Sequence, residues 1–402
     1  MRRIRLIACA LAAAFVTAPA QAENVVRWAT TFSPAGFDPH AYDNIQTSMV
    51  QQQVFEPLVC YDLQDKLQPC LAVSWKQLDP LTWEFALRRG VTFHDGTPFT
   101  SADVVFSFER ARADTSADAS VVSDITGVEA RGADAVRIVT RKPDFLLWDK
   151  ASFVRVLSKA WAEAHDARLP ARPEDLATAY PSSHANGTGP FMLESFEPGR
   201  RTVLVRNPRW WGLEQYPHNI DRIEQLKVDA PEQGMAMLLR GKVDFVQEIP
   251  TGQLDRVRAA PGVRLEQGEA ALTQYLGFDL TSPELRTANI KGRNPFRDKR
   301  VRQAVYQAID FEQVRAALDG LAAPAGMILG RTAVGYEEEL DRRLSYDPAR
   351  ARELLAEAGY ADGFDVALDC SNFRPGLPRH PADARRDRHQ GEPQDQVGRR
   401  AE

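Results

Sequence analysis

The segment between Ile223 and Ile249 contains the strongest constraint on the fold of this chain. It consists of "IEQLKV", then "PEQGMAMLLRGK", then "VDFVQEI". The outer pieces have the composition of strands, whereas the middle piece starts with a proline and ends at Gly241, as helices do. A strand, a helix and a strand in this order form a β-α-β unit, in which the helix packs on a sheet. The segment therefore predicts an α/β protein.

The length of the chain predicts more than one lobe. At 402 residues it exceeds what one hydrophobic core usually supports. Hydrophobic residues make up 44% and charged residues 26%, which is typical of a soluble globular protein. A net charge of −5 gives no general reason to expect a nucleic-acid partner, and we predict none.

The first 22 residues have the pattern of a signal peptide. Arg2, Arg3 and Arg5 precede a short apolar run, and small residues follow at Ala20 and Ala22. The apolar run is too short for a bilayer-spanning helix, which needs about 20 residues. The alternative, a buried helix, leaves the flanking charges unexplained. We expect cleavage after Ala22 and a periplasmic mature protein.

Two cysteines flank a polar turn in "LVCYDLQDKLQPCLAVSW". Two short strands joined as a hairpin there would place Cys60 opposite Cys70, close enough for a disulfide in an oxidising periplasm. Two separate buried thiols are the alternative.

Other elements are predicted by local signals. "HDGTPFTSADVVFSFERA" has a turn at Asp95-Gly96, after which Thr100 and Asp103 can form a helix capping box. We also predict helices over 45–55, 299–318 and 348–358, and a return to strands over 263–280.

The sequence contains no visible catalytic constellation. None of the seven histidines has metal-ligand spacing, and no nucleophile elbow, phosphate-binding loop or dinucleotide fingerprint occurs. We read "FHDGT" as a turn followed by a helix cap instead of a metal site. We therefore predict a binding protein that is not an enzyme and has no metal or cofactor. An exported hydrolase with a dispersed Ser-His-Asp set is the rival interpretation.

Eight stretches, in order, resemble the family 5 extracellular solute-binding proteins, the dipeptide-, oligopeptide- and nickel-binding components of ABC importers. They are "FDPH" from Phe37, "VFEPLV" from Val54, "WEFALRRGVTFHDGTPFTSADVVFSFERA" from Trp83, "GTGPF" from Gly187, "NPRWW" from Asn207, "GKVDFV" from Gly241, "NPFRDKRVRQAVYQAID" from Asn294 and "ARELLAEAGYADGFDVALDC" from Ala351. The resemblance thus covers residues 25 to 370.

The resemblance implies a two-lobe type II periplasmic binding protein fold with an extra subdomain in lobe one. It implies lobe one at 23–265, an inserted subdomain at about 63–183, and a partial lobe two at 266–371. Such a protein closes on a short peptide or similar solute and delivers it, as a monomer, to the permease and ATPase subunits of an importer. A nickel chelate, haem, an opine or an oligosaccharide are the alternative ligands.

The resemblance also suggests which residues bind the ligand. The first-lobe loop of the family corresponds to "FSPAGFDPHAYDNIQTS", which makes Phe37, Tyr42, Gln46 and Thr47 candidates. Ordinary packing is the alternative for Phe37 and Tyr42. Arg155 falls where nickel-binding relatives use an arginine for an anionic chelator.

The resemblance stops near Asn372, whereas relatives run on well beyond this point. The last 31 positions, 372–402, are rich in arginine and proline and contain almost nothing large and apolar. We expect a disordered tail produced by a shift of reading frame between about Asn372 and Asp383, not a basic arm that binds nucleic acid. Resequencing the gene there tests this expectation.

Overall fold

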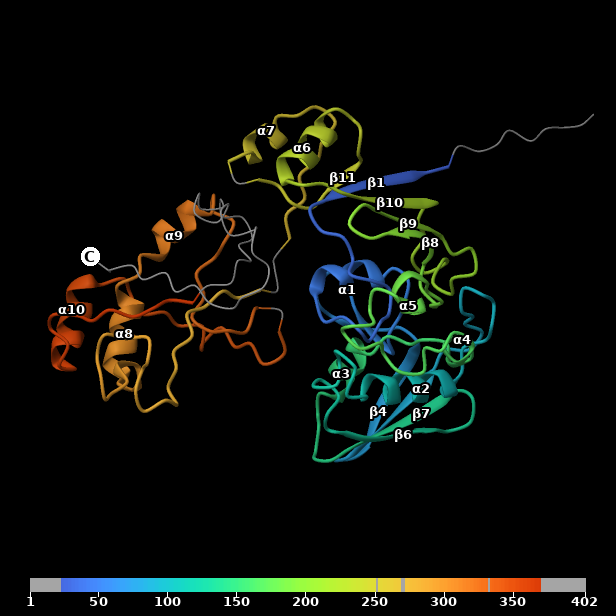
Figure 1. Ribbon diagram of the computed structural model, residues 1–402, viewed down its shortest axis with the longest axis horizontal. Coiled ribbons are helices and arrows are strands. Elements are labelled where there is room, and N and C mark those ends of the chain that lie inside the picture. The colour runs from blue at the N-terminus through green and yellow to red at the C-terminus, as the bar shows by residue number, and fades with distance from the viewer. Residues whose placement is uncertain (1–22, 251, 269–271, 332, 370–402) are drawn as a thin grey trace, which may run out of the picture.

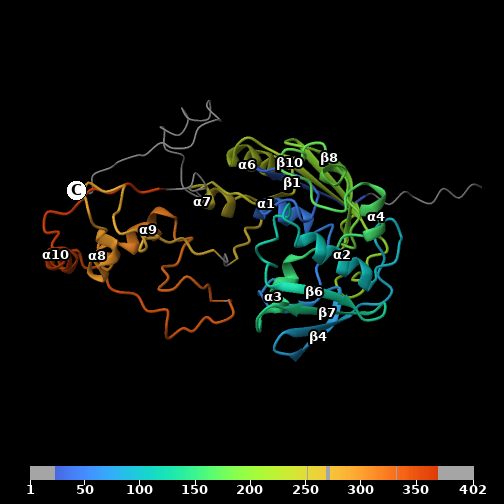
Figure 2. The same ribbon diagram turned by 60° about the horizontal axis from the view of Figure 1, so that its bottom comes forward.

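The computed structural model describes residues 23–250, 252–268, 272–331 and 333–369. Figures 1 and 2 show two bodies that are joined by the chain that follows helix α7 (Leu254–Arg258). Strand β11 (Phe245–Val246) precedes this helix. The predicted signal peptide and the predicted aberrant tail lie outside the described residues.

A five-stranded sheet organises the first body. Its strand order is β11-β1-β10-β9-β8, with β1 parallel to both β10 and β11 and the other neighbours antiparallel. Helix α6 packs over β1 and β11, beside a small core around Ala29, Val228 and Val243. The predicted β-α-β unit is therefore present, with β1 inserted between its two strands. The remaining bounds are β1 Val25–Thr30, β8 Phe191–Glu197, β9 Arg201–Arg206, β10 Arg222–Lys227 and α6 Pro231–Leu239.

A four-stranded antiparallel sheet forms the other end of the first body. Its order is β4-β5-β7-β6, and the alternating residues Trp83, Phe85 and Leu87 of β5 point into the largest core. Helix α2 packs against β6 and β7, and its predicted capping box between Thr100 and Asp103 is confirmed. The bounds are β4 Ala72–Asp79, β5 Thr82–Leu87, β6 Ile125–Ala130, β7 Ala135–Thr140, α2 Ser101–Ala111 and α3 Leu147–Phe153.

The cysteine hairpin forms with a different register from the predicted one. Strand β2 (Val59–Tyr61) pairs with β3 (Leu67–Pro69), and the residue opposite Cys60 is Gln68. Cys70 lies beyond the end of β3, and the disulfide to Cys60 runs diagonally across the strand pair, with 5.5 Å between the two Cα atoms. Asp62 causes the offset, because its carboxylate accepts hydrogen bonds from the Gln64 and Lys66 amides and tightens the turn.

Three short helices complete the first body: α1 Ile45–Gln51, α4 Lys159–Ala164 and α5 Tyr180–Ser183. Helix α1 is shorter than the helix predicted over 45–55. A second core beneath the five-stranded sheet includes Val50, Phe55, Leu157 and Leu204.

The second body contains α8 Lys299–Gln307, α9 Phe311–Ala317 and α10 Pro348–Glu357, with a 3-10 turn at Pro295–Arg297. The helix predicted over 348–358 is confirmed, but the one predicted over 299–318 is two helices. Asp310 separates them, since its carboxylate accepts from the Glu312 and Gln313 amides and starts α9. The predicted strands over 263–280 are absent from the described part of that stretch, which follows the short helix α7 (Leu254–Arg258).

Candidate functional site

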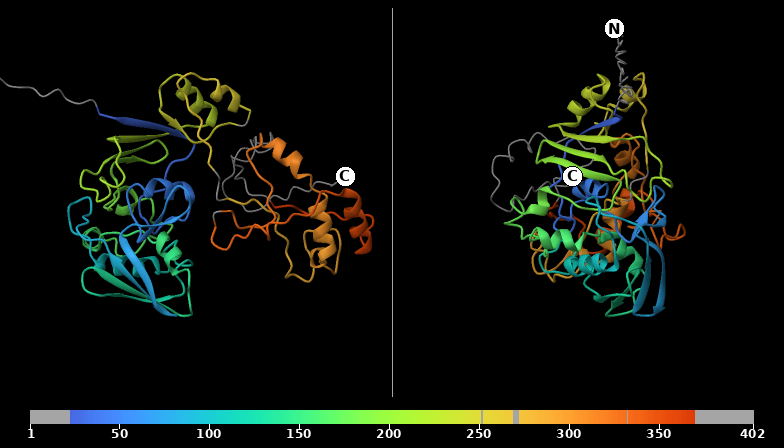
Figure 3. Two further views of the ribbon diagram at one scale, coloured as in Figure 1. Left: turned by 180° about the vertical axis from the view of Figure 1, so that it is seen from behind. Right: turned by 90° about the vertical axis from the view of Figure 1, so that its right-hand side faces the viewer.

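The surface around α1 is where the first body faces the second. In Figures 1 and 3, α1 lies on the side of the first body nearest to the C-terminal body, and α3 lies on the same side in Figures 1 and 2. Asn44 starts α1, because its side chain accepts a 2.8 Å hydrogen bond from the Thr47 amide. The loop before α1 and the chain after α3 therefore position the candidate residues.

Two of the predicted ligand-binding residues are buried. Phe37 has 0% exposure and packs edge-to-face on Phe196 at a centroid distance of 5.2 Å. Thr47 has 1% exposure, and its hydroxyl accepts a 2.9 Å hydrogen bond from the Ala35 amide. Neither side chain offers surface to a ligand in this conformation. Packing, the alternative interpretation of Phe37, accounts for its position.

Tyr42 and Gln46 remain half-buried on the surface of the loop and of α1. The Tyr42 hydroxyl donates to the Ser182 hydroxyl at 3.2 Å, and burial raises the pKa of this tyrosine. A side chain at Gly36 would collide with the Tyr42 ring, since a Cβ there would lie 2.3 Å from the hydroxyl oxygen. The side-chain amide of Gln46 makes no hydrogen bond to another residue of the described ranges, so it is available to a ligand.

A buried ion pair holds the loop in place. Arg110 donates to both carboxylate oxygens of Asp38, at 2.7 and 2.6 Å, and neither side chain is exposed. Arg110 also donates to His40 Nδ1 at 3.0 Å, while His40 Nε2 donates to the Arg155 carbonyl at 2.9 Å. Burial and the Arg110 charge lower the pKa of His40 to about 3, so this imidazole is neutral. The pair thus connects the "FDPH" loop to α2 and to the backbone of Arg155.

The guanidinium of Arg155 is the notable group beside this loop. It forms no hydrogen bond or ion pair with any other residue that the structure describes, and the residue as a whole is half-buried. Burial lowers the pKa of Arg155, and the nearby Asp118 charge opposes that change. Asp118 Oδ2 is itself buried with no partner among the described residues, and burial raises the pKa of Asp118 to about 6.

Sequence reasoning missed Asp118. It lies in the loop after α2, and the neighbouring Ala117 amide and Ser116 hydroxyl donate to the His40 carbonyl at 2.9 and 3.2 Å. His40 therefore joins the Asp118 loop and the Arg155 segment. The spacing of these residues along the chain gives no signal that they meet.

A second buried carboxylate connects three of the sequence stretches quoted above. Glu56 accepts from the Thr188 hydroxyl at 2.7 Å and from the indole nitrogens of Trp210 and Trp211 at 2.9 and 3.0 Å. Burial raises the pKa of Glu56 to about 6, against the effect of these donors. Gly187 lets its own backbone approach the backbone of Val54 closely, since a Cβ at this position would lie 2.0 Å from the Val54 carbonyl oxygen.

His94 is a structural residue, as the turn-and-cap interpretation implies. Its Nδ1 accepts from the Gly187 amide at 3.3 Å, and its Nε2 donates to the Gly189 carbonyl at 3.1 Å. No group of three or more histidine, cysteine, aspartate or glutamate side chains within the described ranges could hold a metal ion. The helices of those ranges are also too short or too polar to cross a membrane.

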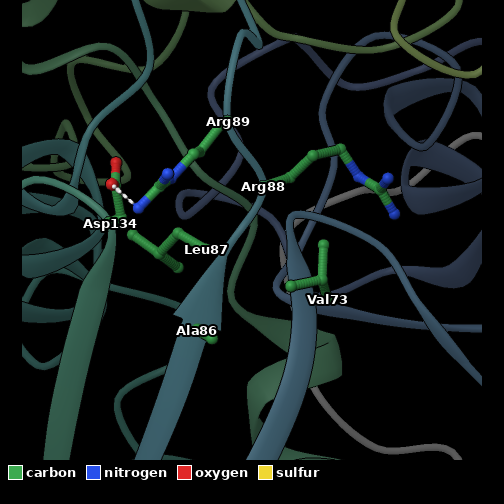
Figure 4. Close-up of a pocket in the computed structure, with 6 residues that line it drawn as sticks. All are labelled: Val73, Ala86, Leu87, Arg88, Arg89 and Asp134. Atoms are coloured by element: carbon green, nitrogen blue, oxygen red, sulfur yellow. Dashed lines mark ion pairs between the residues drawn. The ribbon is translucent and has the colours of Figure 1, made fainter.

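A hollow of about 470 Å³ lies at the start of β4 and the end of β5. Figure 4 shows the residues that line it. Arg89 points toward Asp134 and pairs with it at 2.8 Å, whereas Arg88 points away. Arg88 donates to the Cys70 carbonyl at 2.9 Å, and its guanidinium carbon lies 3.7 Å from the centre of the Trp211 ring. Because both cations already have partners, this hollow is a weaker candidate than the surface around Arg155.

Residues 66–381 match the family model described as bacterial extracellular solute-binding proteins, family 5 Middle. Heme-binding protein A of Haemophilus influenzae is 28% identical, over 87% of this chain and 64% of its own length. Glutathione-binding protein GsiB of Salmonella choleraesuis is 27% identical, over 90% of this chain and 67% of its own length. A putative ABC transporter peptide-binding protein of Brucella ovis is 29% identical, over 86% of this chain and 63% of its own length.

Solved structures show the same fold. The periplasmic binding protein DppA of Helicobacter pylori, in complex with peptide STSA, has a TM-score of 0.68 at 20% identity, over 85% of this chain and 67% of its own. NikZ of Campylobacter jejuni, in complex with Ni(L-His), has a TM-score of 0.67 at 24% identity, over 84% of this chain and 64% of its own. These structures confirm the predicted type II periplasmic binding protein fold. The chain spans about two thirds of the length of these relatives.

Proposed function

This chain belongs to the bacterial extracellular solute-binding proteins of family 5, and we propose that it captures a short peptide for an ABC importer. In this proposal the protein is a periplasmic monomer, exported by a signal peptide at residues 1–22, that delivers its ligand to a permease and ATPase. Lobe one is assigned to 23–265, with its inserted subdomain at about 63–183, and lobe two to 266–371. The protein performs no covalent chemistry on its ligand.

The unpartnered guanidinium of Arg155 carries the proposal. A half-buried arginine whose donors bind no other described residue is suited to a carboxylate, which it can bind through two parallel hydrogen bonds. The ligands named for several relatives carry carboxylates: glutathione, the peptide STSA, and agropinic and mannopinic acids. Tyr42 and Gln46 are half-buried in the loop before α1 and in α1 itself, and we propose that they contact the ligand backbone.

Titration calorimetry on the full chain tests this function with a tripeptide and the same tripeptide carrying a C-terminal amide. We expect the free acid to bind at least about tenfold more tightly, because a hydrogen bond to a charged group contributes roughly 1.5–3 kcal/mol. The Arg155→Met variant should lose this difference. Arg89→Met serves as the matched control, since Arg89 is already paired with Asp134, and should retain it.

Two results would contradict the proposal. Equal affinity for the acid and the amide would remove the role of Arg155, and binding of neither peptide would remove the peptide function itself. Nickel with histidine, an opine, haem and an oligosaccharide are titrated in parallel, since these are the alternative ligands.

A further inference from the structure

Three neighbouring strands of the five-stranded sheet, β1, β10 and β9, place polar side chains in one row (Figure 1). Gln225 of β10 lies opposite Trp28 of β1 and also opposite Thr202 of β9. Residues that lie opposite each other on paired strands point to the same face of the sheet. The three side chains therefore stand side by side, on the face that carries Ile223 and Leu204 of the second core.

The polar atoms of this row have no partner in the described part of the chain. Gln225 is 3% exposed and Thr202 is 1% exposed, so neither side chain is open to bulk solvent. The amide oxygen and nitrogen of Gln225, the Thr202 hydroxyl and the Trp28 indole nitrogen are all buried without a hydrogen bond to another described residue. Such groups are costly, because folding removes their hydrogen bonds to water. Their gathering in one row points to a bound molecule.

The strand spacing and the chemistry of the row select water as this molecule. Neighbouring strands lie about 4.8 Å apart, which is too far for one hydrogen bond of about 2.9 Å but suits two such bonds that meet at a bridging atom. The Trp28 indole only donates, the Gln225 amide both donates and accepts, and the Thr202 hydroxyl can do either. A bridging molecule must therefore accept and donate, and a close-packed core admits only a small one.

We propose that this row is an internal water site of the first body. One water molecule lies between Trp28 and Gln225, accepts from the indole N–H and donates to the glutamine oxygen. Another lies between Gln225 and Thr202, accepts from the glutamine N–H and donates to the hydroxyl oxygen. Phe245 of β11 and Phe196 of β8 continue the row at its two ends. Because both are apolar, the site is confined to the three middle strands.

Water magnetic relaxation dispersion on the full chain tests this proposal, because its amplitude reports the water molecules that stay inside a protein for longer than the protein tumbles. Gln225→Met removes the amide from the middle of the row and should lose both waters, which lowers the amplitude. Thr202→Val should lose only the water between β10 and β9, so the amplitude should fall by about half as much.

Gln307→Met is the matched control. Gln307 is also a buried glutamine, but its amide oxygen accepts from Gln303 at 3.2 Å and its amide nitrogen donates to the Ser345 carbonyl at 3.4 Å. This variant should keep the parent amplitude. An unchanged amplitude in Gln225→Met would overturn the proposal. So would a high-resolution crystal structure of the parent protein without water at hydrogen-bonding distance from the Gln225 amide, a result that requires no variant to fold. Both outcomes are independent of whether the protein binds peptide.

Discussion

Disrupting the buried pair between Asp38 and Arg110 should strongly destabilise the first body. Arg110 donates five hydrogen bonds: two to Asp38, one to His40, and one each to the carbonyls of Ala167 and Leu169. Both partners of the ion pair have 0% exposure. Asp38→Asn therefore leaves a buried guanidinium without a compensating charge.

The magnitude follows from this complete burial. Removing one partner of a buried ion pair costs about 3–5 kcal/mol, because the remaining charge cannot be rehydrated without opening the core. Replacing both partners, as in Asp38→Leu with Arg110→Met, leaves no buried charge. The double variant should therefore be more stable than Asp38→Asn alone.

Urea denaturation followed by tryptophan fluorescence measures this effect in the first body alone. All seven tryptophans lie at or before Trp211, so the signal contains no contribution from the second body. Glu129→Gln is the control, because the exposed pair of Glu129 with Arg131 should contribute at most about 1 kcal/mol. The reasoning is refuted if Asp38→Asn costs no more than Glu129→Gln, or if the double variant is less stable than Asp38→Asn.

Three further predictions concern individual groups. Glu56 has a pKa of about 6 in the folded protein, above its usual 4.5. Its contribution to the free energy of unfolding therefore decreases as the pH rises from 4.5 through 6. Urea titrations above pH 6 should find Glu56→Gln more stable, relative to the parent protein, than at low pH, by up to about 2 kcal/mol. Replacing Cys60 and Cys70 by serine should cost about 2–3 kcal/mol, seen as a lower melting temperature that reductant no longer changes. Below pH 6, Asp118 becomes neutral, and its charge no longer competes with a ligand carboxylate for the Arg155 guanidinium. A carboxylate ligand should therefore bind several-fold more tightly at pH 5 than at pH 7. If the affinity of Asp118→Asn keeps the same pH dependence as that of the parent protein, this explanation is wrong.

Elements set by neighbouring residues could be predicted from the sequence. The capping box of α2 requires only Thr100 and Asp103, and α10 follows from a periodic apolar face after Asp347. The break between α8 and α9 was also readable, because Asp310 is a good helix N-cap in the middle of the predicted helix. The prediction of strands over 263–280 was wrong for the described part of that stretch for another reason. A strand needs a partner strand, and the local sequence does not show whether one is available.

Contacts between distant segments could not be predicted. Phe37 looks like a loop residue in sequence, and only the approach of Phe196 from β8 makes it part of a core. Arg155 was suggested by resemblance alone. The closeness of Asp118 to Arg155 depends on His40, which joins their two segments through hydrogen bonds.

The stretches that carry the family resemblance act mainly as scaffold. "FDPH" supplies Asp38 to the buried ion pair, and "VFEPLV" supplies Glu56, which "GTGPF" and "NPRWW" hold through Thr188, Trp210 and Trp211. Asp38, Glu56 and Thr188 are buried, and the polar groups of this set are satisfied by each other. Matching them therefore identifies the fold and not the ligand, in keeping with relatives named for haem, glutathione and peptides. In the proposed function, specificity comes from side chains that this scaffold leaves without a hydrogen-bond partner, and Arg155 is such a side chain among the described residues.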